Sequence, residues 1–326
     1  MYDWASQAIE RLHVYVTDSG FVFAPVYVLS SLALGGLYWL LAKPDNSLLL
    51  YLFPREIYRH PSTKADVGIA TVNILFVALG GVSFIVIAPI IATLTVVLLV
   101  DPTGLGDAGE LGLGWGIVLI ALLVLAEDLA RYLVHRAHHE SSVLWPFHAV
   151  HHSAQVMTPL TFFRAHPAYY LTQKVVISIL TGLSQGLIVA AAFQAAPAWI
   201  FLAAMFISRL YMAFGLHLRH SHIPLSYGRL IEHVVISPRL HQVHHSIDPR
   251  HYDKNFGEIF AIWDWAFGTL CIPEPGETFE FGLIDDEGHS VHPHPTLTSA
   301  MIVPFRESAR VIARRTSREG KAVEAS

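Results

Sequence analysis

The fold is decided by residues 113–139, which read Leu113-Gly-Trp-Gly-Ile-Val-Leu-Ile-Ala-Leu-Leu-Val-Leu-Ala-Glu-Asp-Leu-Ala-Arg-Tyr-Leu-Val-His-Arg-Ala-His-His139. The run from Leu113 to Val134 is long and apolar enough to cross a hydrocarbon core, which takes about 20 residues. It becomes polar at Glu127, Asp128 and Arg131. Ionisable groups inside an apolar helix are costly and are usually functional. We therefore predict a membrane helix that leads into a histidine-rich site.

The composition of the whole chain agrees with this stretch. Of its 326 residues, 53% are hydrophobic and only 14% are charged, against roughly a quarter charged in soluble domains. Twenty histidines nearly equal the 21 lysines and arginines, and 15 of them fall between His135 and His251. The single cysteine, Cys271, excludes an intrachain disulfide and cysteine-rich metal sites. A net charge of −5 without a basic stripe predicts no nucleic-acid partner.

Three other apolar regions, residues 21–42, 67–100 and 169–216, are candidate membrane segments. Region 67–100 is too long for one upright helix, and Gly80-Gly81 and Pro89 are candidate break points. It most simply crosses once with a kink, although a re-entrant hairpin is an alternative. Region 169–216 predicts two antiparallel helices with a tip near residues 194–197. The preferred count is therefore about five crossings, within a range of about four to six.

The charges of the connecting loops predict which side each loop faces. Loop 43–66 carries four basic residues, whereas loop 101–112 carries three acidic residues and no basic one. The positive-inside rule then places the first loop, and with it every histidine-rich segment, in the cytoplasm. We expect an all-α, polytopic bundle of an integral membrane protein, with a histidine-rich di-metal cap and an active site that face the cytoplasm. The expected domains are a membrane region (1–112), a catalytic domain (113–272) and a cytoplasmic tail (273–326).

Histidines fall into four clusters with spacings of three and four residues, which place side chains on one helical face. The clusters are His135-Arg-Ala-His138-His139, His148-Ala-Val-His151-His152, His217-Leu-Arg-His220-Ser-His222 and His241-Gln-Val-His244-His245. Imidazole suits zinc, copper, iron and nickel, and one cation satisfies several buried rings together. A pool of nine rings is enough for two ions: His135, His139, His148, His151, His152, His220, His241, His244 and His245. Asp128 lies two helical turns before His135, so we expect it to orient the rings or to have a structural polar role at the site.

Taken together and in this order, these motifs resemble the fatty acid hydroxylase and sterol desaturase superfamily of integral-membrane, non-haem di-iron enzymes. The resemblance covers roughly residues 126–270. It rests on Asp128 to His139, Leu144-Trp-Pro-Phe-His148 to Ser153, Arg164-Ala-His166-Pro167, His220-Ser221, Ser237-Pro-Arg-Leu-His241 to Ser246, and Asn255-Phe-Gly to Trp263-Asp264 and Thr269. By position it implies the same nine histidines as ligands of two iron ions.

Four further histidines are additional ligand candidates beside the family pattern. His138 is an extra imidazole next to the usual pair, and His166 is either a tenth ligand or a hydrogen-bonding group. Around the third cluster the family has His-Ser-Asn where this chain has His220-Ser-His222. His220 is the preferred ligand there, and His217 could replace or join it. We expect His289, His292 and His294 to be exposed loop residues.

The resemblance implies that O2 is reduced at paired irons and that an unactivated C–H bond of a lipid substrate, such as a fatty acyl chain or a sterol, is oxidised. Hydroxylation is weakly favoured over desaturation. The chain has no dinucleotide-binding GxGxxG after a predicted strand and no cysteine set for a cluster, so we expect electrons from a separate cytochrome or ferredoxin with its reductase. The alternatives are a membrane metal-transport or metal-binding protein and a haem-binding electron-transfer protein.

Residues 306–326 carry six basic residues and three glutamates. We expect a frayed helix and a disordered end there. A surface helix that docks on anionic lipid is the alternative.

Overall fold

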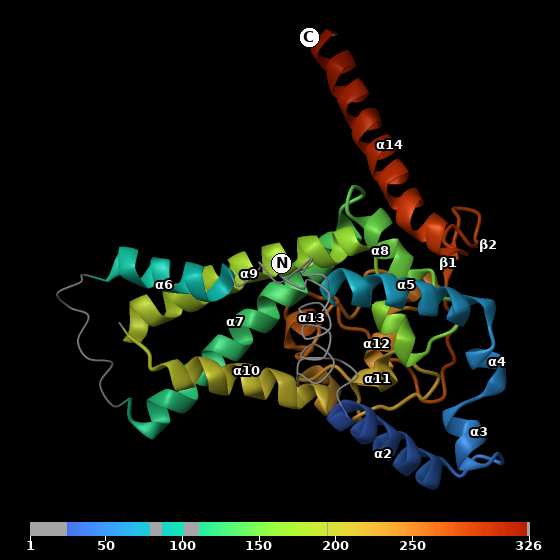
Figure 1. The fold of residues 1–326 in the computed structure, drawn as a ribbon, viewed down its shortest axis with the longest axis horizontal. Helices are drawn as coiled ribbons and strands as arrows, with labels where there is room; N and C mark the ends of the chain where they lie inside the picture. Colours follow the sequence, from blue (N-terminus) through green and yellow to red (C-terminus); the bar gives the residue numbers. More distant parts are fainter. Residues whose placement is uncertain (1–24, 79–86, 101–110, 194, 325–326) are drawn as a thin grey trace, which may run out of the picture.

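The computed structural model describes residues 25–78, 87–100, 111–193 and 195–324, and these residues are mostly helical (Figure 1), as predicted. The N-terminal half contains α2 (Pro25–Ala42), α3 (Leu48–Leu52), α4 (Arg55–Tyr58), α5 (Pro61–Ala78), α6 (Ile87–Leu99), α7 (Leu113–Glu140), α8 (Trp145–His152) and η1 (Pro159–Phe163). The remainder contains α9 (Pro167–Ile188), η2 (Val189–Phe193), α10 (Ala198–Met212), α11 (Leu216–Arg219), η3 (Ile231–His233), α12 (Pro238–His244), η4 (Pro249–His251), α13 (Ile262–Ala266), β1 (Leu283–Ile284), β2 (Ser290–Val291) and α14 (Leu297–Glu324). The two short strands pair antiparallel.

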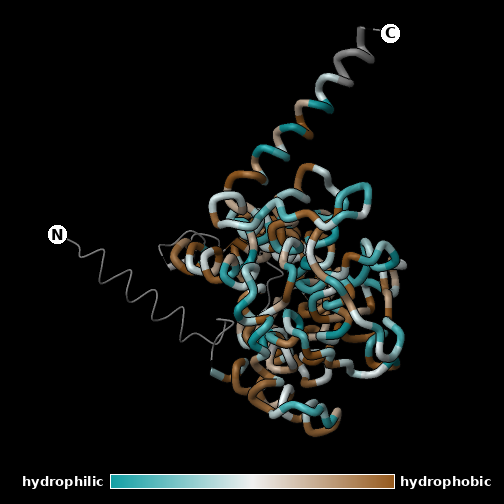
Figure 2. Tube along the Cα trace, turned by 90° about the vertical axis from the view of Figure 1, so that its right-hand side faces the viewer, coloured by the Kyte–Doolittle hydropathy of each residue, from teal (hydrophilic) through white to brown (hydrophobic). Residues whose placement is uncertain are grey.

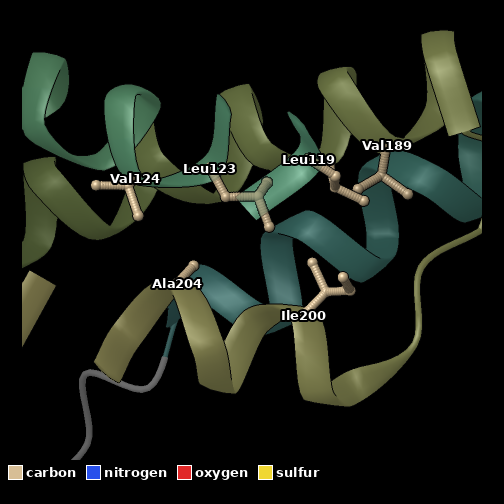
Figure 3. Close-up of a cluster of buried hydrophobic side chains, with 6 residues drawn as sticks. All are labelled: Leu119, Leu123, Val124, Val189, Ile200 and Ala204. Carbon is tan, nitrogen blue, oxygen red and sulfur yellow. The ribbon is translucent and has the colours of Figure 1, made fainter. Parts of the chain in front are cut away.

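The long apolar helices α6, α7, α9 and α10 pack together at one end of the molecule (Figure 1). Helix α7 contacts both α9 and α10, and the aliphatic side chains between them form a closed core (Figure 3): Leu119, Leu123, Val124, Val189, Ile200 and Ala204. Helices α6 and α9 approach closely because Gly186 presents no side chain. A Cβ at Gly186 would lie 2.6 Å from the Cβ of Thr95. Small residues allow such close contact between membrane helices.

Within residues 25–78, 87–100, 111–193 and 195–324, two helices are long and apolar enough to cross a membrane: α2 and the continuous α9 and η2. Only 17% of the first and 22% of the second are buried inside the protein, and α6 and α10 are shorter apolar helices. The predicted region 67–100 divides into the end of α5 and all of α6, and its predicted break at Gly80-Gly81 lies outside the described residues. The acidic loop at 101–110 and the start of the first predicted span, residues 21–24, also lie outside them.

At the other end of the molecule, α8, α11, α12 and α13 form a compact cap (Figure 1). The segment after residue 272 returns to this cap. The Ile247 N–H donates to the Glu280 carbonyl, and the Arg239 guanidinium lies 3.9 Å from the centre of the Phe279 ring. The expectation of an exposed His294 is wrong, because its ring is buried and its carbonyl accepts a hydrogen bond from Arg164.

Candidate metal centre

The cap brings the nine predicted histidines into two groups. Within each group, one ring nitrogen per residue lies within 4.8 Å of all the others. The first group, called group A, contains His135, His139, His148, His152 and His244. The second group, called group B, contains His151, His220, His241 and His245. The motifs His148 to His152 and His241 to His245 therefore each contribute to both groups, whereas His135 and His139 contribute to group A alone.

The ring nitrogens of each group point toward one another. In group A, Nε2 of His148 lies 3.1 Å from Nε2 of His135 and 3.2 Å from Nε2 of His152. In group B, Nε2 of His220 lies 3.1 Å from that of His151 and 2.9 Å from that of His241. The two groups adjoin, because the rings of His152 and His245 stack with their centres 4.3 Å apart.

Backbone carbonyls of the loop after α12 orient two of the group A rings. Nδ1 of His135 donates to the Phe256 carbonyl at 2.8 Å, and Nδ1 of His244 donates to the Lys254 carbonyl at 2.9 Å. Nδ1 of His139 lies 3.9 Å from an Asp253 carboxylate oxygen. A hydrogen bond at Nδ1 fixes the tautomer and leaves Nε2 free as a metal ligand.

The environment holds these rings in the neutral form that binds metal. Burial, together with neighbouring histidines, lowers the pKa of His148, His152, His241 and His245 well below its usual value. In the described part of the chain, the atoms buried without a hydrogen-bond partner include Nε2 of His139 and of His244 in group A, and also Nε2 of His138, which lies outside both groups. A buried polar atom without a partner is costly. A cation in group A would satisfy Nε2 of His139 and of His244, and in group B the converging Nε2 atoms offer a similar donor set. The donors of both groups therefore fit imidazole-binding metals.

Asp264 holds the loop that supplies these carbonyls. Its carboxylate accepts from the N–H groups of Phe256 and Gly257, both at 2.8 Å, and from the Thr269 hydroxyl at 2.6 Å. The carboxylate therefore fixes the Phe256 peptide, whose carbonyl accepts from His135.

Asp128 acts on the same loop rather than on a ring. Its carboxylate accepts at 3.0 Å from the N–H groups of Ile259 and Phe260 and from Nε1 of Trp263. Asp128, two turns before His135, therefore holds the backbone of residues 259 and 260, which follow Phe256. Among the described residues, none of its hydrogen bonds is to an imidazole.

We expect Asp128→Asn to lower the free energy of unfolding by about 1–3 kcal/mol, because asparagine has one acceptor oxygen where aspartate has two. Its NH2 group then faces a buried N–H donor that has lost its acceptor. The measurement is denaturant unfolding in detergent. Glu127→Gln is the matched control, since Glu127 pairs with Arg131 in a partly exposed bridge and Arg131 keeps its second bridge to Glu258, so a smaller loss is expected. Equal losses for both variants would contradict the assigned role of Asp128.

The four additional candidates lie outside both groups. Nδ1 of His138 bonds to the Val134 carbonyl, and His166 uses both ring nitrogens, one on the Ala168 N–H and one on the Met301 carbonyl. Nδ1 of His217 lies 3.2 Å from the Tyr27 carbonyl, and Nε2 of His222 lies 2.6 Å from the Tyr51 carbonyl. Of the third cluster, the structure brings His220 alone into a group.

An ion pair that supports α8 has no signal in the sequence. Nη1 of Arg164 lies 2.7 Å from Oδ1 of Asp66 in α5, and both side chains are buried. The same guanidinium donates to the Val150 carbonyl and the Ser153 hydroxyl, at the end of α8. The pair therefore fixes the helix end that carries His151 and His152. In the sequence, Asp66 is distinguished only by its position directly before the apolar region 67–100.

The fold and the two histidine groups define a helical, histidine-rich candidate metalloprotein, and comparison with known proteins identifies the class. Residues 120–269 match the family described as Fatty acid hydroxylase. The resemblance to the fatty acid hydroxylase and sterol desaturase superfamily is thereby confirmed.

Three curated relatives show the range of this similarity. Alkylglycerol monooxygenase of Danio rerio is 29% identical over 46% of this chain and 30% of its own length. Ornithine lipid hydroxylase OlsE of Rhizobium tropici is 32% identical over 49% of this chain and 44% of its own length. Delta(7)-sterol 5(6)-desaturase erg3C of Aspergillus fumigatus is 28% identical over 57% of this chain and 61% of its own length. The chain thus spans between about a third and three fifths of these relatives. No solved structure matches it.

Proposed function

We propose that this chain is a membrane-bound, O2-dependent oxidoreductase that hydroxylates, or alternatively desaturates, a C–H bond of a lipid. The observation that carries the proposal is the pair of buried histidine groups within a segment that matches the fatty acid hydroxylase family. The names of the relatives, an alkylglycerol monooxygenase, an ornithine lipid hydroxylase and a sterol desaturase, support oxidation of a lipid C–H bond.

The nine histidines of groups A and B would hold two iron ions, one in each group. Bound iron would supply the activation of O2 and the one-electron chemistry that C–H oxidation requires. The protein's own part is to keep the rings neutral by burial and to aim Nε2 inward through the carbonyls at Lys254 and Phe256. A separate cytochrome or ferredoxin with a reductase would deliver the electrons.

The membrane arrangement is part of the proposal. The apolar, outward-facing surfaces of α2 and α9 support insertion in lipid. With α5 and α6, α7 and α10, they would form a polytopic bundle of about four to six spans. The cap, and with it the active site, would face the cytoplasm. The domain limits at residues 112 and 272 remain part of this proposal.

A cavity beside the cap is a candidate site for a lipid chain. It has a volume of about 220 Å³ and lies between α2, α3, η1 and α11. Its lining is mainly apolar and includes Leu32, Leu52, Leu160 and Leu218, with Ser221 next to the group B residue His220. Apolar pockets with few polar groups are typical of sites for apolar ligands.

We expect Leu160→Trp to lower turnover of a long-chain lipid about tenfold while the metal content stays unchanged, because the larger side chain occupies the cavity. The measurement is product formed in cells by lipid mass spectrometry, with iron quantified on the purified variant. Leu49→Trp is the control, since Leu49 is 69% exposed on α3 and does not line the cavity. Unchanged turnover in Leu160→Trp would show that the lipid substrate does not occupy the cavity.

The decisive test of the proposed function is anaerobic purification followed by metal analysis and Mössbauer spectroscopy. Two iron ions per chain are expected, one for each histidine group. A stoichiometric haem or a single zinc would overturn the proposal. Comparative lipid mass spectrometry of cells with and without the gene then separates the two reactions. A gain of one oxygen marks hydroxylation, and a loss of two hydrogens marks desaturation.

A further inference from the structure

Helix α14 is the one element in the described part of the chain whose far half projects well beyond the body of the molecule (Figures 1 and 2). Its first turns are anchored on α5 and α8. Ala300 packs with Ile69 and Val150, and the Met301 carbonyl accepts from His166. Farther along, Arg315 donates to the Ser142 hydroxyl at 2.7 Å. The helix is therefore placed by the cap, against which the Phe305 ring also packs, on Phe147 and His166. From residue 309 to residue 317, every side chain except that of Val311 is exposed in the described structure.

The exposed surface of α14 divides into two adjoining faces. Ile302, Phe305 and Ile312 follow a spacing of three and seven residues and are 42%, 55% and 49% exposed. Arg306, Arg310 and Arg314 follow a spacing of four and are also exposed. These spacings place each set on one side of a helix. Ala309 and Ala313, both exposed, lie between the two sets.

The charged residues of this helix are mostly basic. Residues 297–317 contain four arginines and one glutamate, Glu307, which pairs with Arg310. A helix with an apolar face beside a basic face is typical of elements that lie in the interface of an anionic membrane. Long basic side chains reach past the apolar face to the lipid headgroups.

The direction of α14 is consistent with such a position. In Figure 1 the apolar helices α6 and α9 run along the long axis of the molecule, whereas α14 rises from the cap at a steep angle to them. A helix in the membrane interface must lie across the direction of the spanning helices. The colouring of Figure 2 shows polar and apolar residues alternating along α14.

We propose that α14 lies on the cytoplasmic membrane surface and binds an anionic phospholipid leaflet. Arg306, Arg310 and Arg314 contact the headgroup phosphates, and Ile302, Phe305 and Ile312 enter the boundary of the acyl chains. Because α14 packs on α8, this contact holds the cap against the leaflet from which a lipid substrate would enter. The inference rests on the membrane placement in the proposed function and does not depend on the metal.

The test uses the full chain in nanodiscs with single nitroxide-labelled cysteines in a Cys271→Ser background. A label at Ile312→Cys is expected to collide with oxygen, which concentrates in lipid, and to be shielded from a nickel chelate in water. Ser317→Cys is the matched control, since Ser317 is exposed on the polar side of the same helix. The shielding should appear with phosphatidylglycerol in the nanodisc and weaken with phosphatidylcholine alone.

The charge variant sharpens the result. Each basic residue near an anionic surface strengthens binding about fivefold, so Arg306→Gln, Arg310→Gln and Arg314→Gln together should expose the label at 312 to the chelate. Equal accessibility at 312 and 317 would overturn the inference, as would shielding that is independent of lipid charge. Shielding in detergent that rises with protein concentration would indicate a second copy instead and would also overturn it.

One further label separates this inference from the proposed function. Leu187→Cys lies on α9, where the leucine is 51% exposed. If the label at 187 contacts lipid and the label at 312 does not, the inference about α14 fails while the membrane placement stands. If neither label contacts lipid, the membrane placement fails as well.

Discussion

Replacing Asp66 by alanine is expected to lower the free energy of unfolding by about 3–5 kcal/mol, because it leaves the guanidinium of Arg164 buried without its counter-charge. Both side chains are almost fully buried, with Nη1 and Oδ1 2.7 Å apart. The measurement is denaturant unfolding of the purified protein in detergent. Since Arg164 also binds the end of α8, the variant should lose metal at denaturant concentrations that leave its helix content intact.

Glu140→Ala is the matched control, since it also breaks an arginine–carboxylate pair. The bridge from Glu140 to Arg136 is exposed, so its loss should cost no more than about 1 kcal/mol. The double variant Asp66→Ala with Arg164→Met should be more stable than Asp66→Ala alone, because it removes the stranded charge. A double variant less stable than the single one would show that Arg164 acts through its backbone contacts rather than through its charge.

The helical part of the fold could be predicted because its signals are local. The run from Leu113 to Val134 and the polar turn that follows it form one helix, α7, which continues to Glu140. The two helices predicted for region 169–216 are α9 and α10. The tail was predicted less well. Its return to the cap depends on pairs such as Ile247 with Glu280, which lie far apart in the sequence and carry no periodic signal.

The same distinction holds at the candidate site. Spacings of three and four residues within each motif predicted which histidines would share a face, and the structure brings those nine rings together. The division of the nine rings into two groups could not be predicted from the sequence. His151 and His152 are neighbours in the chain, yet their rings join different groups, because successive side chains of a helix point in different directions. The roles of Asp264 and Asp66 also arise from tertiary contacts, as each binds residues of another segment.

This division predicts that the two metals can be lost separately. His244→Ala removes a group A ring and His151→Ala removes a group B ring. Each variant is expected to keep the metal of the group that it leaves intact, because His244→Ala leaves all four rings of group B and His151→Ala leaves all five rings of group A. The altered group loses one ligand and is expected to bind its own metal more weakly. The activity of both variants should fall by more than about 100-fold, because substitutions of residues that only hydrogen-bond to metal ligands already cost up to about 100-fold. Metal analysis and Mössbauer spectroscopy of the purified variants provide the measurement.

His138→Ala is the control for these substitutions. Its ring is as buried as the ligands and lies beside them, 6.1 Å from His148 between ring centres, but it belongs to neither group. This variant should retain both metals and differ from the natural chain only in stability, since the ring packs against Tyr169. Loss of metal in His138→Ala equal to that in His244→Ala would show that the groups extend beyond the nine rings. Loss of both metals in each ligand variant would mean that the two ions bind as one cooperative unit, as expected if a shared ligand bridges them.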